Sequence, residues 1–388
     1  MYTSNTRQFM DNSDIYFFCL KLYYFSVFII LIKIAKKLGI FLLLFYENMY
    51  LLLKKEQITY IIENVTKGKK YIIFSHCAKR KEKPMKNICV SPNDKLSEVL
   101  KYVSENTRIV LEKGVYREKI EICVPNVELV GAGRNSTVIV YDDYAKKLDE
   151  IGREYNTFRT YTAAVLADNV SFRGLTVEND SHSPEIKGQE VALSVCANGF
   201  TAADCGFVST QDTVFCGPLP TDLIERYDGF LKDGLRRGGE MRQIFQNCFI
   251  AGTVDFIFGC GDVLFDRCEI KSVHDARGHG YAAAPAHSAA QETGFVFNRC
   301  RFTQGDGVAE GSIYLARPWR DYGKACFIEC EYGIHIAPGG FDKWNDTERD
   351  KTARFAEYGI DSLTKAGRVK WSQVLSESEK DRLLEIFK

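Results

Sequence analysis

The sequence lacks net charge, membrane-length apolar runs and the common metal-site patterns. Its 388 residues hold 51 Lys/Arg and 51 Asp/Glu, which argues against electrostatic binding to nucleic acid. No apolar run reaches the roughly 18 to 20 residues that cross a bilayer. The 13 cysteines form no CxxC pair and the 6 histidines show no metal spacing, so neither zinc nor a thioredoxin motif is indicated. We expect no nucleic-acid partner, no metal and no other cofactor.

Residues 1–84 differ in composition from the rest of the chain. They hold 14 Lys/Arg against 6 Asp/Glu, with apolar runs at Leu22–Ile32 and Leu38–Tyr46. This leader is a membrane anchor, an unusual export signal, or an extension upstream of a true start at Met85, and the sequence leaves the three open. The expected functional domain is 85–388. A start at Met85 makes it cytoplasmic, which the absence of paired cysteines favours; otherwise it is secreted or membrane-anchored, and a membrane contact requires that the leader is genuine.

A short pattern recurs along the body of the chain. Each copy has an apolar stretch, a cysteine and an apolar residue two positions later, which is the period-2 signature of a strand with one face inward. The gaps between successive copies are 30, 43, 20, 32 and 30 residues, counted from Leu175 through the five cysteines Cys205, Cys248, Cys268, Cys300 and Cys330. Such spacing predicts a stacked β-solenoid with free thiols in its core and an insertion at 217–238 in the longest gap.

Both ends of this predicted solenoid carry helix signals. Leu96, Val99, Leu100 and Val103 have helical spacing, so we expect an amphipathic capping helix within 94–104. The stretch 376–379 is a capping box, which predicts a charged C-terminal helix ending near Phe387. Solenoids need such caps to shield their terminal apolar faces. We expect a monomer.

Four segments place polar residues in otherwise apolar strands, namely 188–193, 209–215, 252–259 and 314–319. Asp212 follows Cys205 by seven residues, and Asp255 follows Cys248 by seven. Equal offsets on adjacent coils predict two carboxylates on one face, about 5 Å apart in strand spacing. Such a pair beside Arg317 favours unequal pKa values, one group ionised and one protonated.

Five motifs, in order, resemble those of the pectin methylesterases, a carbohydrate esterase family. They are GVYREKI (114–120), GQEVAL (188–193), TQDTVF (210–215), GTVDFIFG (252–259) and YLARPW (314–319). The resemblance covers about residues 88 to 371. It implies a right-handed parallel β-helix, which agrees with the repeat pattern. It also implies hydrolysis of galacturonate methyl esters in pectin, homogalacturonan or methylated oligogalacturonides, with release of methanol and no metal.

Roles for individual residues also follow from the resemblance. It implies that Asp255 is the nucleophile and that Asp212 is the acid and then the base. Gln189 and Gln211 would stabilise the oxyanion, and Arg317 would hold Asp255 ionised. A further set would bind sugar, with Trp319 stacking on a ring and Phe215 and Phe256 lining the cleft.

The chain departs from the family pattern beside these residues. Glu190, Val214 and Ala316 stand where the family usually has alanine, leucine and glycine, and the family's Thr-Ala-Gln-Gly-Arg stretch appears as Tyr281–Pro285. Together with the insertion at 217–238, these departures leave open the preferred chain length and methylation pattern of the substrate.

A β-solenoid can also carry other functions. Pieces of a polygalacturonase signature at Gly278–Gly280 and Arg368–Lys370 lie far from the Asp142–Asp143 pair, so we expect these to be surface or turn residues. Calcium ligands of a lyase and a serine esterase G-x-S-x-G are absent. The remaining alternative is a non-catalytic carbohydrate-binding solenoid that keeps Trp319, Phe215 and Phe256 as its sugar platform.

Overall fold

The computed structural model describes residues 59–64, 69–74, 85–182 and 184–388. The chain divides into two compact units, Met1–Glu82 and Lys83–Lys388. In the first unit, strands β1 (Thr59–Asn64) and β2 (Lys69–Phe74) pair antiparallel. The two apolar runs predicted at 22–32 and 38–46 lie outside the described residues. None of the helices in the described ranges is long and apolar enough to cross a membrane.

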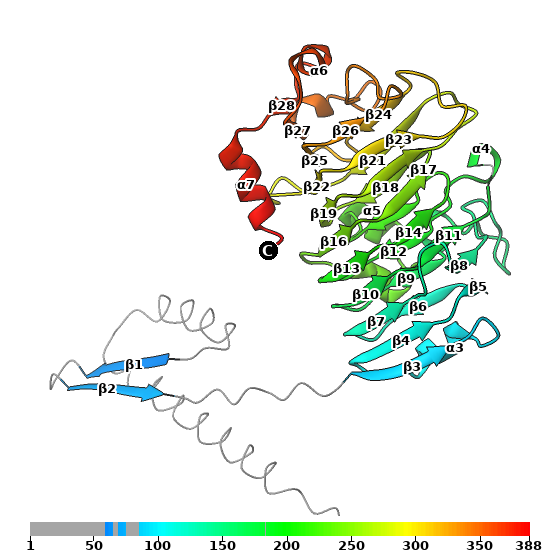
Figure 1. Ribbon diagram of the computed structural model, residues 1–388, viewed down its shortest axis with the longest axis vertical. Helices are drawn as coiled ribbons and strands as arrows, with labels where there is room; N and C mark the ends of the chain where they lie inside the picture. The colour runs from blue at the N-terminus through cyan, green and yellow to red at the C-terminus, as the bar shows by residue number, and fades with distance from the viewer. Residues whose placement is uncertain (1–58, 65–68, 75–84, 183) are drawn as a thin grey trace, which may run out of the picture. The chain divides into compact units, whose positions relative to one another are not determined.

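The second unit is a stack of coils whose strands form three parallel sheets (Figure 1). The first sheet has eleven strands: β3 (Lys86–Val90), β4 (Thr107–Leu111), β7 (Val127–Val130), β10 (Ser171–Arg173), β13 (Phe200–Ala203), β16 (Arg242–Gln246), β19 (Asp262–Asp266), β22 (Phe295–Asn298), β25 (Lys324–Ile328), β27 (Arg354–Tyr358) and β28 (Gln373–Val374). The second has eight: β5 (Gly114–Arg117), β8 (Thr137–Tyr141), β11 (Thr176–Asn179), β14 (Gly206–Val208), β17 (Phe249–Gly252), β20 (Glu269–Ser272), β23 (Arg301–Gln304) and β26 (Glu331–Tyr332). The third has seven: β6 (Ile120–Ile122), β9 (Ala163–Val165), β12 (Leu193–Val195), β15 (Val214–Cys216), β18 (Val254–Gly259), β21 (Gly280–Pro285) and β24 (Ile313–Ala316).

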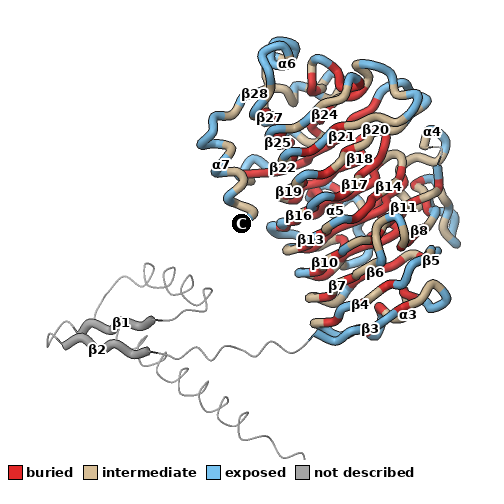
Figure 2. Tube along the Cα trace, in the orientation of Figure 1, coloured by how far each residue is buried: buried red, intermediate tan, exposed pale blue. Residues whose placement is uncertain are grey.

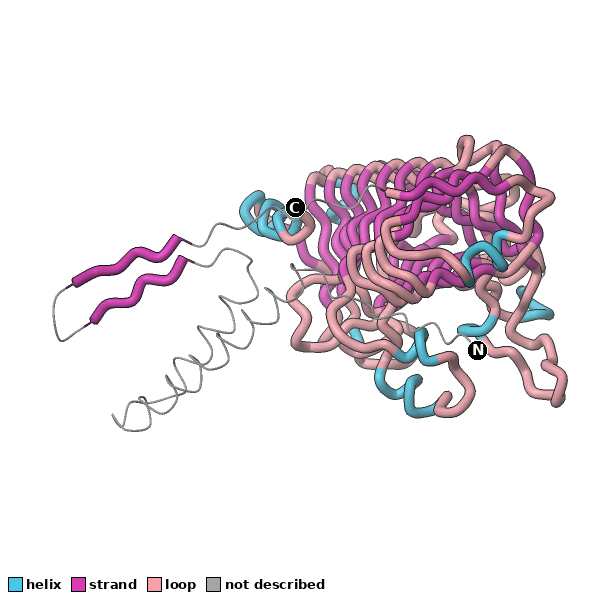
Figure 3. Tube along the Cα trace, turned by 90° about the horizontal axis from the view of Figure 1, so that it is seen from below, coloured by secondary structure: helices cyan, strands magenta, loops and turns pink. Residues whose placement is uncertain are grey.

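Helices occupy the connections and the ends of the stack. Their bounds are α3 (Leu96–Lys101), η1 (Thr157–Arg159), α4 (Pro184–Lys187), α5 (Thr221–Arg226), η2 (Asp233–Arg236), η3 (Arg349–Lys351), α6 (Ser362–Gly367) and α7 (Glu377–Glu385). The predicted insertion is the connection from β15 to β16, and it contains α5 and η2. The third sheet therefore receives the long excursions of the chain, while the first and second sheets follow each other through short corners (Figure 3).

The predicted cysteine repeat is confirmed, and the structure supplies its cause. Each of the five cysteines follows a residue with positive φ, namely Asp204, Asn247, Arg267, Arg299 and Glu329, whose φ values lie between 49° and 56°. The left-handed conformation makes a sharp corner between the first and second sheets. The next side chain then points inward. The first four cysteines are at most 1% exposed, Cys330 is partly buried, and all five are free thiols.

Aromatic rings continue this order on the inner face of the first sheet. Phe245, Phe265, Phe297 and Phe327 stand in register on adjacent strands. Their ring centroids are 5.0, 4.7 and 4.8 Å apart with interplanar angles of 20°, 11° and 8°. These separations equal the spacing between neighbouring strands. The core is therefore a continuous column that runs along the stack (Figure 2).

The predicted N-terminal cap is present as α3, with Leu96 and Leu100 buried. The carboxylate of Glu118, from the GVYREKI motif, accepts hydrogen bonds from the backbone amides of Leu96 and Ser97 at 2.9 and 3.0 Å. A carboxylate at that end satisfies otherwise unpaired N–H groups and complements the helix dipole. The first motif thus ties the cap to the first coils.

The C-terminal helix α7 also forms, and Ser376 and Glu379 make the predicted capping box. Its position differs from the expectation, however. Its apolar residues pack on outward-facing residues of the first sheet, including Val296 and Ile328, so α7 covers the outer face of that sheet. The open end is instead closed by three aromatic residues, Phe341, Phe355 and Trp371, in mutual contact.

Candidate active site

The polar residues predicted for the site gather on the third sheet. Strands β15 and β18 pair with Val214 opposite Ile257, and the same register sets Asp212 opposite Asp255. The backbone amide of Asp212 donates to the carbonyl of Val254 at 3.1 Å. The equal offset read from the sequence is therefore confirmed, and the two aspartates occupy adjacent coils.

A bulge aims the side chain of Asp255. Between β18 and β21, Val254 pairs with Tyr281 and Ile257 with Ala283, so β18 holds one extra residue. Asp255 sits in this bulge with φ of 52°, and Asp212 has φ of 65°. Positive φ costs an ordinary residue about 1 kcal/mol or more and is commonly found where function requires it. The bulge sends the Asp255 carboxylate outward and the adjacent Phe256 ring into the core.

The two glycines of GTVDFIFG permit this packing. A Cβ on Gly252 would come within 2.3 Å of the Phe256 Cβ and 2.6 Å of the Thr213 hydroxyl. A Cβ on Gly259, where φ is 133°, would come within 2.0 Å of the Cys216 carbonyl oxygen. Both coils approach too closely for any other residue at these two positions.

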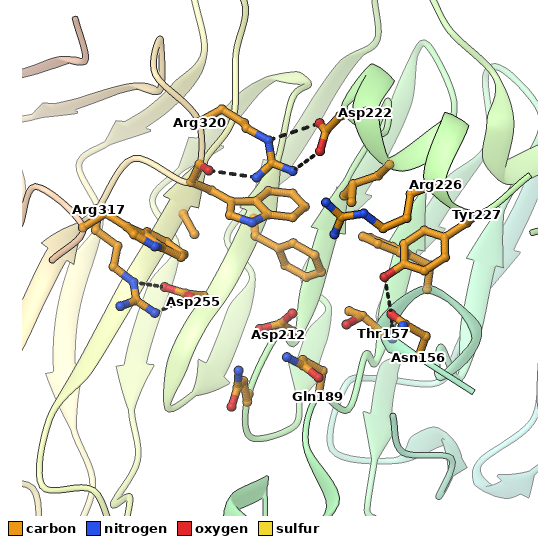
Figure 4. A pocket seen from close by; sticks show the side chains of 17 residues that line it. Asn156, Thr157, Gln189, Asp212, Asp222, Arg226, Tyr227, Asp255, Arg317 and Arg320 are labelled. Carbon is orange, nitrogen blue, oxygen red and sulfur yellow. Dashed lines mark hydrogen bonds and ion pairs between the residues drawn. The ribbon is translucent and has the colours of Figure 1, made fainter. Parts of the chain in front are cut away.

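A cleft of about 480 Å³ lies over these residues (Figure 4). It is lined by Asn156, Thr157, Phe158, Gln189, Gln211, Asp212, Asp222, Leu223, Arg226, Tyr227, Asp255, Phe258, Ala284, Arg317, Trp319, Arg320 and Trp344. All five residues expected to be catalytic are in this set, together with Trp319. Among the described residues, no group of three or more His, Cys, Asp or Glu side chains is arranged to hold a metal ion.

Arg317 and Asp255 form a bidentate ion pair. The Arg317 Nε donates to Asp255 Oδ1 at 2.8 Å, and Nη2 donates to Oδ2 at 2.6 Å. The guanidinium lies between two aromatic rings, 3.7 Å from the centroid of Tyr281 and 3.9 Å from that of Trp344. The aromatic rings on its two faces and the two hydrogen bonds to Asp255 along one edge fix the orientation of the Arg317 guanidinium. Ala316 in place of the family's glycine is compatible with this arrangement.

The two carboxyl groups have different electrostatic surroundings. Burial raises the pKa of Asp255, but the hydrogen bonds and positive charge of Arg317 oppose that rise. For Asp212, burial and the negative charge of Asp255 both raise the pKa, which lies well above its usual value. Asp212 is therefore the group that retains a proton, and Asp255 is the group that ionises first.

Gln211 is oriented by a contact that the sequence did not predict. Arg277 donates from Nη1 to the Gln211 Oε1 at 2.9 Å. Asp275 holds Arg277 through Nε and Nη2, both at 2.7 Å. Because the amide oxygen is already an acceptor for Arg277, the amide N–H₂ of Gln211 remains for other partners.

Two of the predicted sugar-binding residues do not reach the cleft. Phe215 and Phe256 are both 0% exposed. Phe256 belongs to the main core, and Phe215 packs beneath the cleft, with its ring centroid 5.2 Å from that of Phe158 and 5.1 Å from that of Phe258. The expectation that they line the cleft is wrong. Phe256 faces the core because it directly follows the outward-facing Asp255, and Phe215 is covered by Phe158, Phe258 and the leucines of the excursion that follows it. Phe158 and Phe258 occupy that position instead.

Other surface assignments also need correction. His279 and His287 have no metal spacing in the sequence and are most simply expected in solvent-exposed loops, but only His279 is exposed and His287 is 2% exposed. Its ring Nε2 lies 3.0 Å from the Gly261 carbonyl oxygen, and burial lowers its pKa to about 4. Asp143 is 2% exposed and is paired with Lys119 and Lys147. The sequence did not predict Trp344 and the α5 residues in the cleft lining, or Tyr281 against Arg317, because nothing local in the sequence indicates these contacts.

The sequence and the fold of this chain are similar to those of known pectinesterases. The pectinesterase family profile matches residues 82–218 and 232–385. Pectinesterase QRT1 of Arabidopsis thaliana is 29% identical over 71% of this chain and 67% of its own length. Pectin methylesterase from carrot superposes with a TM-score of 0.63 at 26% identity, covering 76% of this chain and 90% of that one.

A second solved structure, a pectin methylesterase in complex with a hexasaccharide, has a TM-score of 0.62 at 26% identity and covers 74% of this chain and 90% of that one. The right-handed parallel β-helix expected from the sequence is confirmed by these structural matches.

Proposed function

The chain belongs to the pectinesterase family, whose members are carboxylic ester hydrolases, and from this premise we propose that its cleft hydrolyses galacturonate methyl esters by an aspartate nucleophile. The observation that carries the proposal is the unequal pair of aspartates. Asp255 is paired with Arg317, which opposes the rise of its pKa on burial, whereas for Asp212 burial and the charge of Asp255 both raise the pKa. A binding surface has no need for two buried carboxyl groups of which only one is paired with an arginine.

The first half of the reaction forms an acyl-enzyme. The Asp255 carboxylate attacks the carbonyl carbon of the C6 methyl ester, and the negative charge moves to the carbonyl oxygen. The amide N–H groups of Gln189 and Gln211 stabilise that oxyanion. The Arg277 contact favours this role for Gln211, since it leaves the N–H₂ end free. Asp212 then gives its proton to the departing methoxide, methanol leaves, and an anhydride joins Asp255 to the sugar.

The second half regenerates the enzyme. Asp212, now a carboxylate, takes a proton from water, and the resulting hydroxide attacks the anhydride carbonyl. The C–O bond to Asp255 breaks, which returns the negative charge to Asp255 and releases the sugar as a carboxylic acid that then loses its proton to solvent. Arg317 stabilises the recovered carboxylate through its two hydrogen bonds. Trp319 stacks on a sugar ring of the substrate and is itself supported by Phe258, with ring centroids 5.8 Å apart.

Methanol release tests the proposal directly. Wild-type protein and Asp255→Asn are incubated with methylated pectin and with short methylated oligogalacturonides. We expect release from the wild type and its loss in the variant. The Asp255→Asn protein should still bind oligogalacturonides, whereas a purely sugar-binding solenoid has no turnover to lose. Absence of release from a folded wild-type protein on both substrates would refute the esterase proposal.

We also propose that residues 85–388 are sufficient for this activity. All the residues lining the cleft lie in the second compact unit. A chain starting at Met85 is therefore expected to release methanol at the rate of the full chain. A lower rate would assign residues 1–84 a part in the activity, and the ratio of rates on polymer and oligomer would indicate the compartment.

A further inference from the structure

The excursion between β15 and β16 forms one wall of the cleft. Asp222, Leu223, Arg226 and Tyr227, all in α5 or directly after it, line the cavity. The family match ends at 218 and resumes at 232, so the residues of this wall lie outside the part of the chain that the family shares. We refer to residues 219–231 as the α5 wall. Its side chains are therefore candidates for a property that is particular to this chain.

The α5 wall is built into the fold. Leu219, Leu223 and Leu231 are buried in a small apolar cluster that also contains Phe215 and Phe258. The Tyr227 hydroxyl donates to the Asn156 Oδ1 at 3.0 Å, and the Phe158 and Tyr227 rings meet edge to face with centroids 6.1 Å apart. The wall is thus anchored to the third sheet and to the β8–β9 connection, which fixes where its polar side chains point.

Three arginines line the cleft, and two of them are already paired. Arg317 holds Asp255 through two hydrogen bonds. Arg320 holds Asp222 through Nε and Nη2, at 3.2 and 2.7 Å, and donates its remaining Nη1 to the Trp319 carbonyl at 2.9 Å. Neither guanidinium has its fork available for a ligand.

Arg226 differs from both. It is exposed and has no hydrogen bond or ion pair to any residue that the structure describes. Among the residues that the structure describes, no lysine and no histidine lines the cleft. Arg226 is therefore the one cation of the described lining whose donors are free, and it lies across the cleft from Arg317 (Figure 4).

The chemistry of the proposed substrate indicates what this cation binds. A demethylated galacturonate carries a planar carboxylate, which a free guanidinium recognises in a bidentate manner. At the other side of the cleft, the negative charge of Asp255 disfavours such a group, whereas a neutral methyl ester is accepted there. The cleft thus offers an ester position and a carboxylate position at separate places.

We propose that Arg226 on the α5 wall binds the free carboxylate of a galacturonate unit near the ester being hydrolysed. This inference rests on the proposed esterase function and specifies its substrate as partly demethylated oligogalacturonide or pectin. The enzyme then acts preferentially next to units that are already demethylated. A fully methylated chain provides no anion for Arg226 and is the poorer substrate.

Two defined substrates test the inference on the full chain. One is trigalacturonate methylated at all three carboxyl groups, and the other carries a single methyl ester with free carboxylates on its neighbours. The wild type is expected to have the higher kcat/KM on the mixed substrate. Arg226→Gln should lower that value about tenfold and change the fully methylated rate less than about twofold, since only a charge-assisted contact is lost. The kcat/KM of Arg226→Lys on the mixed substrate should lie between those of the wild type and Arg226→Gln.

The matched control is Arg236→Gln. Arg236 lies on the same excursion but pairs with Asp228 at 2.6 Å and does not line the cleft. We expect the control to keep the wild-type preference. An equal loss on both substrates in Arg226→Gln, or no preference in the wild type, would overturn the inference and leave the esterase function standing.

A binding measurement separates this inference from the esterase proposal. Calorimetry of unesterified trigalacturonate needs no turnover. Arg226→Gln should bind it about tenfold more weakly than wild type or Arg236→Gln, whatever the rate of methanol release. Equal affinities in all three proteins would overturn the carboxylate assignment. If Arg226→Gln binds trigalacturonate more weakly than wild type but the wild type releases no methanol, Arg226 remains assigned to the carboxylate and the esterase proposal is rejected.

Discussion

The first and third sheets are built by the same coils yet differ in what each coil repeats. On the first sheet, phenylalanines stack ring on ring at strand spacing, and five of the corners begin with a positive-φ residue followed by cysteine. On the third sheet, Asp212 and Asp255 occupy equivalent positions, but a bulge follows Val254 and the flanking connections leave the stack. Regular repetition stabilises the solenoid, and departures from it create the site.

The strongest test of this contrast is Asp255→Asn. The change removes the proposed nucleophile but keeps the shape of the side chain, so the fold should be retained while methanol release falls about 10⁴-fold or more. Initial rates, together with circular dichroism of the same sample, measure both properties. A variant with more than about a tenth of wild-type activity would show that another group attacks the ester.

Phe297→Ala should lower stability and leave the catalytic rate almost unchanged. Phe297 is 0% exposed and stacks between Phe265 and Phe327. Truncating a buried phenylalanine costs about 3 to 5 kcal/mol of unfolding free energy. Denaturant titration measures that loss, and kcat of the remaining folded enzyme at low temperature should stay within about twofold. A large fall in kcat would mean that the column also positions the site.

Arg317→Gln should affect rate and pH dependence together. Loss of a preorganised charged group costs about 10²- to 10³-fold in rate. The pKa of Asp255 is raised by burial and held down by Arg317, so it should rise further without the arginine. The acid limb of the rate–pH profile, where Asp255 must lose its proton, should then move to higher pH. A rate loss with an unmoved acid limb would assign Arg317 a role in positioning alone.

Asp212→Asn should lose activity but should be more stable than the wild type at higher pH. The folded-state pKa of Asp212 is raised, so its favourable contribution exists below the unfolded pKa and is lost as pH rises through the folded pKa. The variant should therefore be more stable than wild type at pH 8, by about 1 kcal/mol or more, and the difference should vanish near pH 4. Thermal melts at the two pH values measure this. An equal difference at both would contradict the raised pKa.

The smallest effect is expected at the cysteine ladder. Cys268→Ala removes one buried sulfur atom and should cost about 1 kcal/mol of unfolding free energy without changing kcat. Because the thiols are free, a reducing agent should leave the wild-type melting temperature unchanged. A drop of several degrees with reductant would show that the ladder oxidises in solution.

Sequence reasoning succeeded where position along the chain determines position in the fold. The cysteine repeat predicted the coil spacing. The equal offsets of Asp212 and Asp255 predicted that they are neighbours, because residues at equal offsets on adjacent parallel strands lie side by side. The five expected catalytic residues line one cleft; their individual roles stay predictions that the variants above test.

The errors arose where register is broken or where packing partners are distant. The family resemblance implied that Phe256 lines the cleft, but its side chain lies in the core, and Phe258, which follows the bulge at Asp255, lines the cavity instead. The C-terminal helix was predicted correctly, whereas its seat on the outer face of the first sheet depends on Val296 and Ile328. The reach of the α5 wall into the cleft depends on a contact with Asn156, 71 positions away in sequence.

Insertions and deletions should have different effects in the α5 excursion and in the bulge at Asp255. The coils that carry Asp212 and Asp255 remain neighbours although the α5 excursion separates them, because strand pairing holds them together. The length of that excursion is therefore free to change over evolution without moving the catalytic pair. Removal of one residue from the bulge would instead turn the Asp255 carboxylate toward the apolar core. A change in the length of the α5 excursion therefore affects the position of the catalytic pair less than the loss of a single residue from the bulge.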